Sequence, residues 1–207
     1  MKSNLVPEVS DPRFKMHDDG SAELETLIFL KSLVELIKPE RILETGTYKG
    51  YSSCYMAEGL KNNGSGKIET MEIDTRLIAE AKELWVGEGV QDYIESNCVS
   101  SLNYETDKKY DLIFLDTEPN IRFKEFVKFY RNLKQGGFLF IHDLHRHMSQ
   151  GVKNSDHPDY EHWPFGELPS FIKNCVVSGE CVLFHFPTPR GLVGFYKKSP
   201  EDYHFKR

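Results

Sequence analysis

Apolar positions follow two different spacings along the chain. Apolar residues three and four apart predict helices over residues 24–37, 50–60, 77–85, 123–133 and 168–175. Short apolar runs between turn signals predict strands at residues 41–45, 67–73, 92–98, 110–116, 138–143, 181–186 and 192–196. One of these turn signals is Gly136-Gly137, which predicts a turn before the strand at 138–143. Helical and strand segments therefore alternate along most of the chain.

This alternation predicts an α/β fold. Five strand–helix repeats followed by a hairpin are typical of a mostly parallel sheet with helices on both faces. The run YDLIFLD at residues 110–116 is continuously apolar until its final acid, as in a strand buried on both faces. We expect one domain over residues 1–207, with an N-terminal arm at residues 1–20. Ligands of such sheets bind outside the carboxyl ends of the strands.

Composition narrows the class of protein. With 39% hydrophobic residues among 207, the chain is too apolar for disorder, and no apolar run is long enough to span a membrane. The first residues lack the apolar core of a signal peptide. The net charge of −6 argues against nucleic-acid binding. Four scattered cysteines without a C-x-x-C pair, with Cys54 and Cys98 expected in the core, predict a reduced, cytoplasmic protein.

A glycine turn follows the first sheet strand. The segment ILETGTYKGYSS has the pattern E-x-G-x-x-x-G, in which Gly46 and Gly50 permit a sharp turn and a close approach to a ligand. The helix that begins there offers free N–H groups to a carboxylate or phosphate. The pattern is neither G-x-G-x-x-G nor a P-loop. Taken alone, it also suits an ordinary turn.

Glu72 ends the next strand, in KIETME. A carboxylate at that place can accept hydrogen bonds from both hydroxyls of a ribose. Alone it would be a solvated loop acid, but together with the glycine turn it favours a nucleoside site.

The ordered segments ILETGTYKG, KIETMEID, IESNCVSSL, YDLIFLD and LKQGGFLFIHD resemble class I S-adenosylmethionine-dependent methyltransferases. The sequence is most similar to their small O-methyltransferase branch, which includes catechol-type and macrolide-sugar-type enzymes. The resemblance implies a Rossmann-like, doubly wound sheet of seven strands in the order 3-2-1-4-5-7-6, with strand 7 antiparallel. It also implies S-adenosylmethionine as cofactor.

The same resemblance assigns roles to residues of the first half of the chain. Glu44, Gly46 and Gly50 would frame the methionine end of the cofactor, and Glu72 would bind its ribose. Three residues lie where that branch contacts the amino and carboxylate groups: Thr47, Tyr51 and Ser52. Asn97 stands where the family usually has an acid that meets the adenine amino group.

Asp116 and Asp143 end the two strongest strands. Neighbouring strands lie about 4.8 Å apart, so the two carboxylates would repel unless a proton or a cation lies between them. Oxygen ligands favour Mg²⁺ or Mn²⁺, and similar metal-dependent enzymes add a third ligand beside the second acid, here His142. A histidine ligand would shift the preference toward Mn²⁺, Fe²⁺ or Zn²⁺. The alternative is that Asp116 lies near the transferred methyl group without a metal.

Five of the eight histidines lie between residues 142 and 162. We expect residues 144–164 to form an active-site loop, since connections of this length are usually functional. His145 and His147, with Asp143, are the predicted catalytic residues, because an imidazole can take a proton from an attacking hydroxyl near neutral pH. For Arg122 there are two interpretations, contact with an acid of the substrate and a solvated side chain, and the second is favoured.

The predicted function is methyl transfer from S-adenosylmethionine to a hydroxyl of a small molecule. Two alternatives stay open: an NAD-type oxidoreductase on a similar sheet, and a non-catalytic cofactor-binding protein of the same fold. The sequence does not identify the acceptor. A homodimer is expected from the resemblance, without an identified interface.

Overall fold

The computed structural model describes residues 5–8, 11–143 and 170–200. Two compact units make up the chain, residues 1–106 and 107–207, and we describe them in turn. The strand order of the seven-stranded sheet is β5-β4-β3-β6-β7-β9-β8, which confirms the predicted 3-2-1-4-5-7-6 order. Among the described residues no helix has the length and apolar character needed to cross a membrane.

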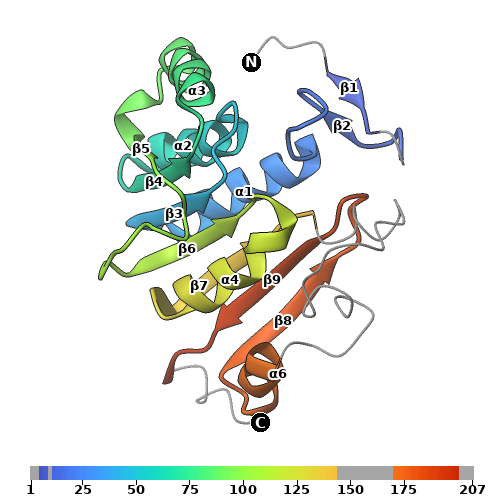
Figure 1. Cartoon of the computed structure of the whole chain (residues 1–207), viewed down its shortest axis with the longest axis vertical. Helices are drawn as coiled ribbons and strands as arrows, with labels where there is room; N and C mark the ends of the chain where they lie inside the picture. Colours follow the sequence, from blue (N-terminus) through green and yellow to red (C-terminus); the bar gives the residue numbers. More distant parts are fainter. Residues whose placement is uncertain (1–4, 9–10, 144–169, 201–207) are drawn as a thin grey trace. The chain divides into compact units, whose positions relative to one another are not determined.

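The first unit carries three parallel strands and three α-helices (Figure 1). Its elements are β1 (Val6–Pro7), β2 (Lys15–Met16), α1 (Leu24–Ile37), β3 (Arg41–Thr45), α2 (Tyr51–Asn63), β4 (Lys67–Glu72), α3 (Thr75–Glu88), a 3-10 turn (Gln91–Tyr93) and β5 (Ile94–Cys98). Strand β4 pairs in parallel with β3 and with β5. Helix α1 packs on α2, and α2 packs on β4 and α3. Leu27, Leu30 and Val34 are fully buried, as the helical spacing predicts.

The second unit carries the other four strands of the sheet. Its described elements are β6 (Tyr110–Leu115), α4 (Pro119–Tyr130), β7 (Leu133–Ile141), α6 (Ser170–Val177), β8 (Cys181–Phe186) and β9 (Leu192–Lys197). Strands β6 and β7 are parallel, whereas β9 is antiparallel to both β7 and β8. The predicted terminal hairpin is therefore confirmed. Helix α4 packs on β6 and β7, and α6 packs on β8.

Strand β7 begins earlier than predicted. The sequence suggested a turn at Gly136-Gly137 and a strand from residue 138, with Leu133 at the end of the preceding helix. In the structure Leu133 already pairs with Tyr110, and the register shifts between Tyr110 and Leu112. Gly136 has φ 77° and absorbs this irregularity within the strand. The glycine pair therefore marks a bulge in β7 and not a boundary.

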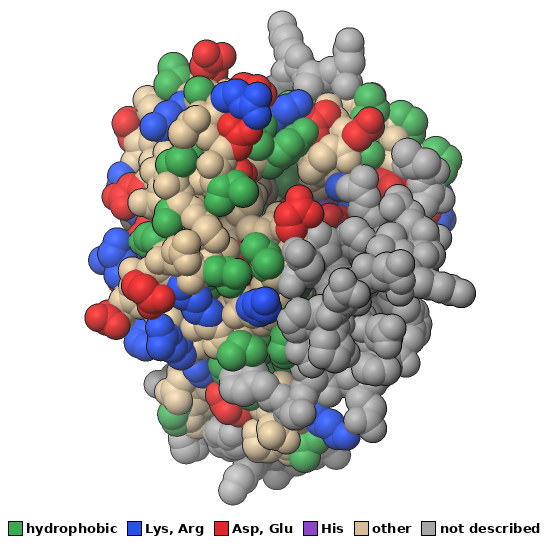
Figure 2. Space-filling model, in the orientation of Figure 1, with side chains coloured by type: hydrophobic (Ala, Val, Ile, Leu, Met, Phe, Trp, Pro, Cys, Tyr) green, Lys and Arg blue, Asp and Glu red, His purple; other side chains and the backbone are tan. Residues whose placement is uncertain are grey.

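Charged side chains of both signs share the described part of the surface. In Figure 2, Lys and Arg side chains lie interspersed with Asp and Glu on the described part of the face.

The cysteines agree with the prediction only in part. All four cysteines are free, and Cys54 is buried as predicted. Cys98 is exposed, so its assignment to the core was wrong; it ends β5, whose side chains are only partly covered. The single-domain interpretation stays a prediction.

Candidate functional site

The predicted glycine turn joins β3 to α2. The N–H groups of Gly46 and Thr47 both donate to the carbonyl oxygen of Met71 on β4, at 3.0 and 3.1 Å. Gly46 and Gly50 have φ values of 82° and 80°, in the left-handed region that glycine alone enters without strain. The turn is therefore tied to the end of β4, and its backbone geometry explains both glycines.

Gly50 is also constrained by packing. A Cβ atom at this position would lie 2.6 Å from the indole nitrogen of Trp85 and 2.7 Å from the Cβ of Ala81. The Trp85 indole N–H donates to the Gly50 carbonyl oxygen at 3.0 Å. Gly50 is the N-cap of α2 and has no side chain that could accept from the first N–H groups of the helix.

The side chains of Glu44 and Thr47 share a buried hydrogen-bond network at the base of the turn. Glu44 is fully buried, and its Oε2 accepts hydrogen bonds from the hydroxyls of Ser53 and Thr70, the latter at 2.6 Å. The hydroxyls of Thr47 and Thr70 lie 2.6 Å apart, and because Thr70 donates to Glu44, Thr47 is the donor of this pair. These hydrogen bonds fix the side chains of Glu44 and Thr47 and connect the turn to β4 and α2.

Glu72 lies at the end of β4 with both carboxylate oxygens oriented by the backbone. Its Oε2 accepts from the N–H of Tyr48 at 2.9 Å, and its Oε1 accepts from Ile73 at 2.8 Å and Asp74 at 3.1 Å. An ionised carboxylate has about four acceptor positions, so three N–H donors do not saturate it. Glu72 is thus held in place while it keeps capacity to accept from a ligand.

The remaining predicted residues of this half lie on α2 and β5. Ser52 is buried in the first turn of α2, and Tyr51 is half-buried beside it. Asn97 pairs with Met71 across β4 and β5, and its amide nitrogen approaches the Thr70 carbonyl oxygen at 3.5 Å. The structure therefore brings Asn97 to the same strand ends as the glycine turn.

A contact that the sequence did not reveal joins the N-terminal arm to this turn. The His17 ring stacks on Tyr51 with centroids 4.3 Å apart, and its Nε2 lies 3.2 Å from the Tyr55 hydroxyl. Asp18 forms an ion pair with Lys49 at 3.0 Å. A lone histidine and an Asp-rich turn carry no sequence signal for this contact, because it depends on how the arm folds back.

The second unit brings the predicted acids together. Single ligand atoms of Asp116, His142 and Asp143 lie within 4.8 Å of one another, and His142 Nδ1 lies 3.1 Å from Asp116 Oδ1. His142 is fully buried, and Asp143 has φ 62°, which aspartate tolerates better than most residues. The predicted grouping of these three side chains is therefore present.

Arg122 is not solvated, so that interpretation was wrong. Its side chain is 5% exposed, and Nη2 lies 3.1 Å from Asp116 Oδ1 and 3.3 Å from Asp143 Oδ2. Its Nη1 donates to the main-chain oxygen of His142. A second arginine, Arg190 in the turn before β9, is also buried, with Nε 3.8 Å from Asp143 Oδ1. Neither arginine was predicted from the sequence as a member of this cluster.

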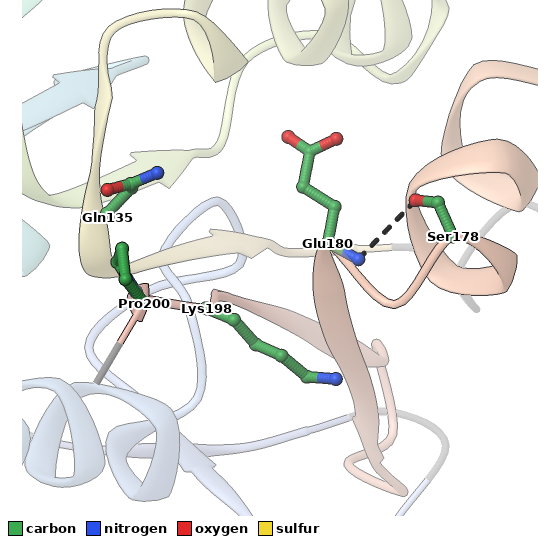
Figure 3. Close-up of a pocket in the computed structure, with 5 residues that line it drawn as sticks. All are labelled: Gln135, Ser178, Glu180, Lys198 and Pro200. Atoms are coloured by element: carbon green, nitrogen blue, oxygen red, sulfur yellow. Dashed lines mark hydrogen bonds between the residues drawn. The ribbon is translucent and has the colours of Figure 1, made fainter. Parts of the chain in front are cut away.

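His145, His147 and the predicted loop at residues 144–164 lie outside the described residues. A hollow of about 440 Å³ elsewhere in the second unit is lined by Gln135, Ser178, Glu180, Lys198 and Pro200 (Figure 3). Gln135 stands near the start of β7, about 23 Å along the chain from His142, which follows the strand, at about 3.3 Å per residue. None of the predicted site residues that the structure describes lines this hollow.

Comparison with known proteins decides the family. The sequence model of the O-methyltransferase family matches residues 16–163. The chain belongs to the O-methyltransferase family.

The curated relatives carry O-methyltransferase names, and the solved structures share the fold. It is 27% identical over 121 residues to a catechol O-methyltransferase of Niastella koreensis, which covers 56% of this chain and 53% of that protein. The chain spans about half to two thirds of the length of the curated relatives it matches. The O-methyltransferase TomG of Streptomyces achromogenes, solved with SAM, has the same fold at a TM-score of 0.68, with 19% identity over 87% of this chain and 83% of TomG. A Bacillus cereus O-methyltransferase solved with SAH gives a TM-score of 0.67, with 20% identity over 87% and 84% of the two chains.

Proposed function

We propose that this O-methyltransferase transfers a methyl group from S-adenosylmethionine to a hydroxyl oxygen of a small molecule. The observation that carries the proposal is Glu72, oriented by three backbone N–H groups beside a glycine turn at the ends of parallel strands. The family supports it. So do the SAM and SAH complexes of TomG and of the Bacillus cereus enzyme.

The first unit offers groups for each part of this cofactor. Three backbone N–H donors leave Glu72 about one acceptor position for a ribose hydroxyl, while the N–H groups at the start of α2 suit the methionine carboxylate. Gly46 and Gly50 allow the backbone to approach closely. Asn97 can accept from the adenine amino group through its side-chain oxygen.

When bound, S-adenosylmethionine supplies an electrophilic methyl group on a sulfonium. The sulfur–carbon bond breaks as the oxygen–carbon bond forms, the hydroxyl proton passes to a base, and S-adenosylhomocysteine is left. This chain contributes position, since an in-line displacement depends strongly on the alignment of its two reactants. His145 and His147 are the proposed proton acceptors, and Asp143 is proposed to orient the groups at the end of β7.

A divalent ion at Asp116, His142 and Asp143 has suitable donor atoms but not a suitable charge environment. Two carboxylates and an imidazole within 4.8 Å would suit Mn²⁺ or a similar ion. Arg122 and Arg190, however, already set two positive charges against the two acids. We therefore derive no step of the reaction through a metal.

Calorimetric titration with S-adenosylhomocysteine tests the cofactor assignment. We expect measurable binding to the wild type, and about ten- to hundredfold weaker binding to Glu72→Gln, since a hydrogen bond to a charged group contributes about 1.5–3 kcal/mol. Glu95→Gln, an exposed acid on β5, is the matched control and should bind normally. A wild type that binds neither S-adenosylmethionine nor its product would refute the proposal, and binding of NAD instead would favour the oxidoreductase.

A further inference from the structure

A buried guanidinium lies where the sequence suggested a metal ion. We propose that Arg122 serves as a built-in cation for Asp116 and Asp143, and that this cluster therefore holds no divalent metal and the methyl transfer needs none. Arg122 is then a positioning residue of the site. This inference deepens the proposed function and rests on it only for the statement about turnover.

The contacts of Arg122 are those of a bridging cation. One nitrogen, Nη2, lies 3.1 Å from an oxygen of Asp116 and 3.3 Å from an oxygen of Asp143. The other nitrogen, Nη1, donates to the main-chain oxygen of His142, the residue directly before Asp143. A single guanidinium therefore holds the ends of β6 and β7 through three acceptors. Its planar set of fixed donors suits this arrangement better than the flexible ammonium of lysine.

The local fold explains why Arg122 reaches this place. It lies in the first turn of α4, which begins three residues after Asp116, and α4 packs on both β6 and β7. The side chain is 5% exposed, so its position is set by packing and by the acids. A guanidinium stays protonated in proteins, so the charge is permanent.

The charges of the cluster balance without a metal. Within the described residues, Asp116 and Asp143 contribute two negative charges, and Arg122 and Arg190 contribute two positive ones. A divalent ion would add two positive charges to groups that are buried or nearly so, next to two fixed guanidinium groups. Like charges at close range in such surroundings are strongly unfavourable. Each acid that would attract the ion already lies within ion-pair distance of an arginine.

His142 fits this arrangement as well. Its Nδ1 lies 3.1 Å from Asp116 Oδ1 and 3.5 Å from Asp143 Oδ1. A ligand nitrogen must present a lone pair to a metal, whereas a hydrogen bond to a carboxylate uses the same nitrogen as a donor. The Asp116 oxygen that faces His142 also accepts from Arg122. The imidazole is thus oriented by the acids and not required as a third ligand.

Mn²⁺ binding measured by electron paramagnetic resonance tests the inference, with Arg122→Met and Arg122→Lys as a matched pair. We expect no bound Mn²⁺ in the wild type after dialysis, and the same melting temperature in EDTA as in excess Mn²⁺. Arg122→Met removes the built-in charge, so its Mn²⁺ affinity should rise by about tenfold or more, and Mn²⁺ should raise its melting temperature. Arg122→Lys keeps the charge and should remain without Mn²⁺. A merely structural role for Arg122 would not separate the two variants in this way.

Wild-type protein that binds one Mn²⁺ per chain, and loses it in Asp116→Asn, would overturn the inference. This measurement decides even if Arg122→Met does not fold. Methyl transfer by the wild type in EDTA at the rate seen with Mn²⁺ is the expected activity result, and an EDTA-sensitive rate would contradict it. Binding of S-adenosylhomocysteine, measured in the same buffers, is independent of this outcome, so a failure of the proposed function would be recognised separately.

Discussion

The glycine turn of the first unit and the acid–arginine cluster of the second are built on different physical principles. The turn depends on backbone geometry: two glycines with positive φ, N–H groups that meet the Met71 carbonyl, and a carboxylate oriented by three further N–H groups. The cluster depends on opposite charges on side chains from separate segments. One region is therefore sensitive to added volume, and the other to removed charge.

This difference matters for how each region tolerates change. A turn fixed by backbone geometry is disrupted when a Cβ atom cannot fit, but it survives many side-chain replacements because main-chain groups make its contacts. A buried charge cluster survives shape-preserving changes of volume but not the loss of one partner, since the remaining charge then lacks compensation.

Asp143→Asn should produce the largest loss of stability. Asparagine keeps the side-chain shape and tolerates φ 62°, but Arg122 and Arg190 would face a neutral amide. Removing one partner of a buried ion pair costs about 3–5 kcal/mol, so the free energy of unfolding in urea should fall by that amount. Turnover should fall strongly, because Asp143 is proposed to orient the groups at the end of β7.

The matched control is Asp111→Asn, in the same unit. Asp111 pairs with Lys134 at 2.8 Å, with both side chains partly exposed, so its loss should cost at most about 1 kcal/mol. S-adenosylhomocysteine affinity of Asp143→Asn should change by less than about threefold, since sites without shared partners act additively. Equal stability losses for the two variants would remove the distinction between a buried cluster and a surface pair.

Gly50→Ala should lower the free energy of unfolding somewhat less than Asp143→Asn does, but it should weaken cofactor binding more. The added Cβ would lie 2.6 Å from the Trp85 indole nitrogen at a φ of 80°. Left-handed backbone costs about 1–2 kcal/mol for a residue with a Cβ, and overpacking adds about 1–3 kcal/mol. Gly64→Ala is the control, because Gly64 has φ 77° with nothing within 4 Å of the added atom. The urea midpoint of Gly64→Ala reports backbone strain alone, whereas that of Gly50→Ala reports strain together with the collision with Trp85. Similar midpoints for both variants would contradict the packing argument.

The same contrast explains what the sequence could predict. The bounds of β3 and the places of Gly46, Gly50 and Glu72 follow from short segments, because a glycine turn and a strand-ending acid are local features. The bulge in β7 was misinterpreted as a turn, since the same glycine pair suits both. The order of strands came from the family resemblance and is confirmed by the structure.

The acid–arginine cluster was only partly predictable. Asp116 and Asp143 could be placed together because both end strands that the fold makes neighbours. Arg122 and Arg190 could not, since an arginine in a helix or a turn is usually exposed and nothing in the local sequence indicates which acid it will meet. Their burial depends on how α4 and the turn before β9 pack, which is information from tertiary structure.

The smallest predicted effect concerns the N-terminal arm on the glycine turn. Burial lowers the pKa of His17, outweighing the opposite influence of Asp18. Between this lowered pKa and the unfolded value of about 6.5, the unfolded chain binds more protons, so the free energy of unfolding rises with pH through that window. The contribution is complete above about pH 6.5 and is lost as the pH falls below it.

His17→Phe keeps a ring against Tyr51 but cannot titrate, so its melting temperature should fall less than that of the wild type between pH 7 and pH 5. Burial also raises the pKa of Tyr55 to about 12, so that neighbour stays neutral throughout and cannot account for the difference. Parallel melting profiles would mean that His17 protonates without disturbing the arm, and the turn would then be held by its backbone contacts alone.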